Sequence, residues 1–139
     1  MIKAGFSIIE ITPPSGLYMA GYAARNSPAN GKKDSLTVRA IVVEKTALVV
    51  ADVIGIDSEM SEKVRKKSIL PDEAITITAT HTHGGPTSMK DRLNSKVDLK
   101  FYDKLEKALI ESIKIAYESS TNVKLYGGVG IEPGVAKNR

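Results

Sequence analysis

Two histidines separated by one residue are the strongest candidates for chemistry in this chain. His81 and His83 are its only histidines; they follow a strand-like run at 74–80 and precede a Gly-Gly-Pro turn at 84–86. Side chains alternate between the faces of an extended backbone, so the two imidazoles are predicted to point the same way, about 6.5–7 Å apart. Such a pair at the end of a strand suits a metal site or an acid–base site.

Three interpretations of the pair remain open on the residues alone: a metal site, an acid–base pair without a metal, and two ordinary loop histidines. A catalytic zinc ion usually takes three protein ligands and a water, and the chain has no cysteine. A carboxylate would have to complete the set, and the candidates are Glu10, Asp52 and Asp57. Asp52 also interrupts an apolar run, where a carboxylate needs hydrogen bonds or a cation, so a structural role is equally open.

The overall composition is that of a globular protein. With 42% apolar and 26% charged residues, the 139 residues are predicted to form a single domain, 1–139. No apolar run approaches the roughly 18–20 residues of a membrane span, and the start lacks the layout of a secretory signal, so we expect a cytoplasmic protein. The net charge of +4 is scattered and aromatic residues are few, so we expect no nucleic-acid binding.

The hydrophobic pattern predicts an α/β fold in which a layered mixed β-sheet has flanking helices. The order is strand, strand, strand, helix, strand, helix, strand, with strands at 5–11, 37–43, 47–53, 75–80 and 123–131 and helices after 57 and at 98–119. The second and third strands are nearly continuous in apolar residues, which is typical of strands buried on both faces. Glycines at 127, 128 and 130 indicate a bulge or a close backbone approach in the last strand.

A long loop at 15–35 is the remaining feature of the first half. Loops of this length are often functional rather than simple connectors. Within it, the apolar segment 19–23 (Met-Ala-Gly-Tyr-Ala) either packs over the sheet or forms part of an active-site wall.

Several segments of the chain, by their order and spacing, resemble the N-terminal part of neutral/alkaline non-lysosomal ceramidases and their prokaryotic relatives. They are Ile11-Thr-Pro-Pro14, the 19–23 segment, 36–43, Asp52 with Gly55-Ile56, Ala79-Thr-His-Thr-His-Gly-Gly-Pro86, and Asn138-Arg139. The resemblance covers essentially the whole chain.

The resemblance implies a zinc-dependent amidase that hydrolyses the N-acyl bond of ceramide-like lipids. By position, His81 would match the first zinc ligand, and His83 the histidine that helps to stabilise the oxyanion. Arg139 would match the arginine of an Asn-Arg motif lining the catalytic centre. These roles agree with general chemistry, in which zinc polarises a carbonyl and nearby donors stabilise the oxyanion. Gly84 departs from the family, which usually has serine there.

Family members are much longer, and the resemblance places their remaining zinc ligands (a second histidine, a glutamate and a tyrosine) beyond residue 139. Two functions therefore stay open. One is a zinc-dependent N-acyl amide hydrolase in truncated or partial form, and the other is a catalytically inactive relative acting as an oligomerising or interaction domain. Because losing the rest of a layered fold exposes apolar surface, we expect a homo-oligomer or association with a missing C-terminal part.

Overall fold

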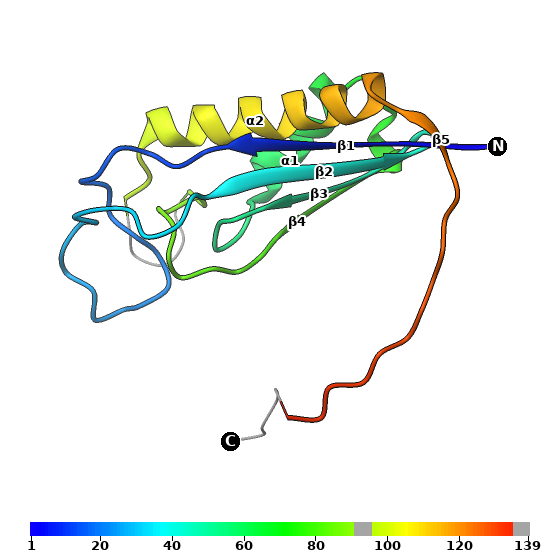
Figure 1. The fold of residues 1–139 in the computed structure, drawn as a ribbon. Coiled ribbons are helices and arrows are strands. Elements are labelled where there is room, and N and C mark those ends of the chain that lie inside the picture. The colour runs from blue at the N-terminus through cyan, green and yellow to red at the C-terminus, as the bar shows by residue number, and fades with distance from the viewer. Residues whose placement is uncertain (91–95, 135–139) are drawn as a thin grey trace.

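A five-stranded mixed sheet with helices against one face forms the fold (Figure 1). The computed structural model describes residues 1–90 and 96–134. Its elements are β1 (Ile2–Glu10), β2 (Thr37–Val43), β3 (Thr46–Ala51), α1 (Ser58–Lys67), a 3-10 turn (Asp72–Ala74), β4 (Ile75–Ala79), α2 (Leu99–Glu118) and β5 (Thr121–Val123). This confirms the predicted α/β class and the order of strands and helices.

The sheet order is β4-β3-β2-β1-β5, and every neighbouring pair is antiparallel except β3 and β4. The chain passes from β3 through α1 to β4, so these two strands run in the same direction, with Ala51 opposite Ala79. Their carboxyl ends therefore meet at one edge of the sheet. The residues that follow them, 52–57 and 80–90, lie at that edge.

The long helix α2 covers the sheet with an apolar stripe. Its buried side chains recur at helical spacing and are Phe101, Tyr102, Leu105, Ala108, Leu109, Ser112, Ile113 and Ala116. Asp98 caps the helix by accepting a hydrogen bond from the Phe101 amide at 2.8 Å. At Gly5 of β1 the backbone of α2 comes so close that a side chain would collide with the carbonyl of Ala116. No helix in the described parts of the chain is long and apolar enough to cross a membrane.

The prediction that the central strands are buried on both faces is wrong for the described residues. β2 and β3 alternate between buried and more exposed positions, and the helices pack on one face only. On the other face Phe6 and Ile8 are 57% and 58% exposed, and Ile41 and Leu48 are 42% and 44% exposed. The strand register places Phe6 opposite Ile41 and Ile41 opposite Leu48. We call these four residues the open face.

The last strand was predicted at 123–131, but β5 spans Thr121–Val123 and shares only Val123 with that range. β5 ends at Val123, because it pairs with β1 and their pairing ends at Ile2. Residues 124–134 form no strand and run away from the sheet (Figure 1). A Cβ atom added to the glycines at 127, 128 and 130 would meet no atom within 4 Å, so no close backbone approach requires them.

Candidate functional site

The histidine segment lies where the parallel strands β3 and β4 end. β4 stops at Ala79, and the Thr80 amide donates to the carbonyl of Ala51 at 3.0 Å. The extended backbone predicted through His81 and His83 is therefore absent. The two rings still lie together, with centroids 5.3 Å apart and planes at 66°. The structure brings the two imidazoles to one place by a turn of the backbone and not by strand alternation.

His81 is held in an unusual backbone conformation by a hydrogen bond of its ring. Its φ is +58°, in the left-handed region that few residues other than glycine adopt. Its Nδ1 lies 2.7 Å from the carbonyl oxygen of Ile54. Because a carbonyl can only accept, Nδ1 must carry the hydrogen, and in the neutral ring Nε2 keeps its lone pair. A histidine fixed in this way has the arrangement common among metal-ligating histidines.

His83 is positioned by the long loop between β1 and β2. A Cβ atom at Gly21 would lie 2.6 Å from Nδ1 and 2.7 Å from Cδ2 of the His83 ring, so only glycine fits there. Gly21 also has φ +106°. The Tyr22 ring meets the His83 ring edge-on, with centroids 4.9 Å apart. Arg25 donates to the carbonyl of His83 at 3.0 Å and stacks 4.9 Å from the centroid of Tyr22.

Backbone hydrogen bonds join the same loop to the residues after His83. The Ala20 amide donates to the carbonyl of Gly85, and the Thr87 amide donates to the carbonyl of Tyr18, both at 3.2 Å. Met19 and Pro86 form an isolated bridge. The apolar segment 19–23 thus lines the histidine segment as a wall. Tyr22 and Arg25 were not singled out from the sequence, since only the length of the loop and the apolar segment pointed to this region.

The carboxylates that were candidates for completing a metal site are hydrogen-bonded or ion-paired to other residues. Asp52 accepts hydrogen bonds from the Thr37 amide at 3.0 Å, the Thr37 hydroxyl at 2.7 Å and Arg39 at 2.6 Å. Burial acts to raise the pKa of Asp52, but the hydrogen bonds from Thr37 and the charge of Arg39 outweigh it and lower the pKa below its usual value. Asp52 therefore takes the structural role.

Glu10 pairs with Lys32 at 2.9 Å, and the hydrogen bond from Lys32 is the main reason that the pKa of Glu10 falls to about 2. Asp57 caps α1 by accepting from the Met60 amide at 2.8 Å. Within residues 1–90 and 96–134, no group of three or more histidine, cysteine, aspartate or glutamate side chains could hold a metal ion. The metal interpretation required one of these carboxylates to complete the ligand set, and the described residues do not bring one into such a group.

Arg139, the third residue that the sequence singled out, lies outside the described residues. The structure thus brings His81 and His83 together and adds Gly21, Tyr22 and Arg25 around them. The carbonyl of Ile54 fixes one ring, and the loop of residues 15–35 fixes the other. This arrangement offers one imidazole nitrogen with a free lone pair beside a second imidazole.

The fold is similar to that of solved ceramidases. Neutral ceramidase from Pseudomonas aeruginosa matches with a TM-score of 0.75 and 20% identity, over 86% of this chain and 22% of that chain. A ceramidase complexed with C2 matches with a TM-score of 0.75 and 23% identity, over 86% of this chain and 21% of that chain. No protein-family model and no curated protein sequence matches the chain.

The chain thus spans about a fifth of the length of these ceramidases. The similarity covers 86% of this chain, and it agrees with the motifs that suggested this family from the sequence. The chain therefore has a ceramidase-like fold, corresponding to one segment of the longer ceramidase structures.

Proposed function

We propose that this chain supplies part of the catalytic centre of a zinc-dependent hydrolase of neutral ceramidase type, which cleaves an N-acyl amide bond. The observation that carries the proposal is the pair of histidines at the end of β4. His81 is fixed through Nδ1 with Nε2 left free, and His83 lies beside it. The likeness in fold to ceramidases supports the choice of reaction.

The donor chemistry of His81 fits a zinc ion, but the described residues supply too few ligands to hold one alone. Nε2 of His81 would be one ligand, and the remaining ligands would come from outside residues 1–90 and 96–134. Zinc would supply polarisation of the amide carbonyl and activation of the attacking oxygen. We infer that the site is shared between this chain and a further polypeptide segment.

The other residues of the site would bind and orient the substrate. An N–H of His83 would donate to the oxyanion that develops as the amide carbonyl is attacked. Gly21 and Tyr22 hold the His83 ring against rotation, which limits the reorganisation needed during the reaction. Arg139 would line the same centre, an assignment that rests on the Asn-Arg motif alone. The proposed substrate is a ceramide-like N-acyl lipid, because the similar structures are ceramidases.

Metal analysis of this chain combined with the segment that supplies the remaining ligands, with and without His81→Ala, tests the proposal, together with an N-acyl amide hydrolysis assay. Zinc that binds the wild type and is lost in His81→Ala, with activity lost in parallel, is the expected result. His83→Ala is the matched comparison, since it should retain the metal and lose activity. Hydrolysis that does not depend on His81 would refute the mechanism, and zinc binding that does not depend on His81 would refute the assigned ligand.

The open face favours a second candidate function. Phe6, Ile8, Ile41 and Leu48 place an apolar surface on the side of the sheet away from the helices. An inactive relative that associates with a second copy through this surface would bury it. A protein that binds no zinc and hydrolyses no amide, yet forms dimers, would favour this function over the enzyme.

A further inference from the structure

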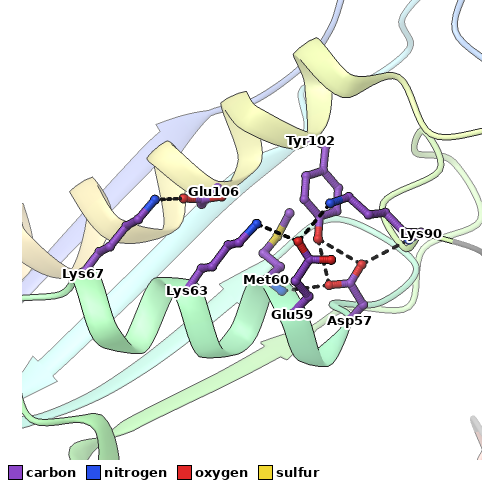
Figure 2. Close-up of polar contacts among 8 residues, drawn as sticks. All are labelled: Asp57, Glu59, Met60, Lys63, Lys67, Lys90, Tyr102 and Glu106. Atoms are coloured by element: carbon purple, nitrogen blue, oxygen red, sulfur yellow. Dashed lines mark hydrogen bonds and ion pairs between the residues drawn. The ribbon is translucent and has the colours of Figure 1, made fainter.

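The carboxylate of Asp57 joins three separate parts of the chain. One oxygen accepts from the Met60 amide at 2.8 Å, in the first turn of α1. The hydroxyl of Tyr102, on α2, lies 2.8 and 3.0 Å from the two oxygens. The amide of Lys90, in the segment that leaves the histidines, donates to Oδ2 at 3.1 Å. Figure 2 shows Asp57 with Tyr102 and Lys90 on either side of its carboxylate.

The partners of Asp57 are themselves firmly held. Tyr102 is 2% exposed, and its pKa is raised because burial disfavours the phenolate and because its hydrogen bond goes to the carboxylate of Asp57. The phenol therefore stays protonated and remains a donor. The ammonium of Lys90 lies 4.4 Å from the centre of the Tyr102 ring and 3.1 Å from a carboxylate oxygen of Glu59. The two groups that Asp57 contacts, the hydroxyl of Tyr102 and the amide of Lys90, are therefore both held in place.

Residues 54, 55 and 57 are each hydrogen-bonded to the segment that carries the histidines. The bonds are from His81 Nδ1 to the Ile54 carbonyl at 2.7 Å, from the Ser88 hydroxyl to the Gly55 carbonyl at 2.7 Å, and from the Lys90 amide to Asp57 at 3.1 Å. Asp57 is the member of this row that is also fixed to both helices. Its carboxylate therefore sets where the row lies relative to α1 and α2.

We propose that Asp57 is a positioning residue for the imidazole of His81. By tying residues 54–57 to Tyr102 and to Lys90, it keeps the Ile54 carbonyl where the His81 ring bonds to it. That bond selects the tautomer in which Nδ1 carries the hydrogen and Nε2 is free. The use of Nε2 as a ligand rests on the proposed function, whereas the tautomer of His81 is a property of the chain in either case.

The variant Asp57→Ser separates the role of Asp57 as a helix cap from its role as a positioning residue. Asp57→Ser retains a good helix N-cap but is too short to contact Tyr102 and Lys90 together. The matched control is Asp98→Ser at the N-cap of α2, where the carboxylate accepts from the Phe101 amide at 2.8 Å. No hydrogen bond of Asp98 to residues 80–90 is found in the described parts of the chain. A second variant, Tyr102→Phe, leaves the Asp57 cap intact and removes one of its partners.

The measurement is the tautomer of His81, from the chemical shifts of its ring nitrogens by NMR at about pH 8, where an ordinary histidine is neutral. Exchange of the Lys90 amide hydrogen is followed on the same samples. In the wild type we expect the tautomer with hydrogen on Nδ1. Asp57→Ser should shift His81 toward the tautomer with hydrogen on Nε2 and raise Lys90 exchange about tenfold or more, as expected for loss of a bond to a charged group. Asp98→Ser should change neither.

Tyr102→Phe should move the His81 tautomer in the same direction, and it carries the test if Asp57→Ser does not fold. An unchanged tautomer in both Asp57→Ser and Tyr102→Phe would overturn the proposal. Equal changes in Asp98→Ser would overturn it too, because the effect would then be general destabilisation. If the chain combined with the segment that supplies the remaining ligands binds no zinc, while Asp57→Ser still shifts the tautomer, the proposed function is refuted and the positioning role is supported.

Discussion

Replacing Gly21 by alanine tests directly whether the loop between β1 and β2 sets the orientation of His83. The added Cβ would lie 2.6 Å from Nδ1 and 2.7 Å from Cδ2 of the His83 ring. Carbon atoms pack favourably at about 3.5–4.0 Å, so the ring would have to move by about 1 Å. Gly21 also has φ +106°, a conformation that an alanine adopts only with strain.

The expected loss of stability has two parts, backbone strain and crowding against His83, and a comparison with Gly16 separates them. A positive φ costs an L-residue about 1–2 kcal/mol, and crowding a packed contact costs a further ~1–3 kcal/mol. Gly16 has φ +102°, but no atom lies within 4 Å of the position of its Cβ. Gly16→Ala should therefore show the backbone part alone. The difference between the two variants measures the contact with His83.

Urea unfolding of both variants gives the two free energies, and NMR of the ring signals reports on His83. We expect Gly21→Ala to lose about 2–5 kcal/mol and to shift the His83 signals, and Gly16→Ala to lose about 1–2 kcal/mol without such a shift. If amide hydrolysis is measurable, a misplacement of about 1 Å should lower it about 100-fold in Gly21→Ala only. Equal losses in the two variants, with the His83 signals unmoved, would refute the reasoning.

Three further predictions concern the rest of the molecule. The pKa of Asp52 lies below its ordinary value of 3.8, so its carboxylate stabilises the fold above that pH, and the contribution is lost as the pH falls below about 3.8. The Tm of the wild type should therefore fall more steeply on acidification than that of Asp52→Asn, and parallel curves would contradict this. Gly5→Ala should lower the Tm strongly, because its Cβ would collide with the backbone carbonyl of Ala116; an unchanged Tm would show that α2 can move away. If the open face joins two copies, light scattering should detect a dimer that Ile41→Glu or Leu48→Lys converts to a monomer, and a wild type that is monomeric at every concentration would disprove self-association.

The elements of the fold followed from local patterns in the sequence. The helix predicted at 98–119 is observed at Leu99–Glu118, because its apolar stripe and the cap at Asp98 lie within the segment itself. The strands predicted from β-branched runs were found for the same reason. What local patterns could not predict is which faces of these strands are covered. Ile41 and Leu48 are apolar like their buried neighbours, and their exposure depends on which other segments pack against the sheet.

The location of the candidate site was predicted, but its geometry was not. The rings of His81 and His83 do lie together, but not by the strand alternation predicted from their spacing, because the backbone at His81 is left-handed and its ring is bonded to the distant carbonyl of Ile54. The roles of the carboxylates likewise depend on partners far along the chain. Asp52 is bonded to Thr37 and Glu10 is paired with Lys32, and neither contact leaves a local signal in the sequence.

The backbone at His81 has a consequence for how this chain can change over time. At φ +58° the residues that fit with little strain are glycine, asparagine and aspartate, besides the histidine that is held there by Ile54. His81→Asn would thus keep the path of the chain while removing the imidazole. A single substitution therefore leaves a chain of the same backbone path without the imidazole, so a relative can keep this fold and lack the proposed site.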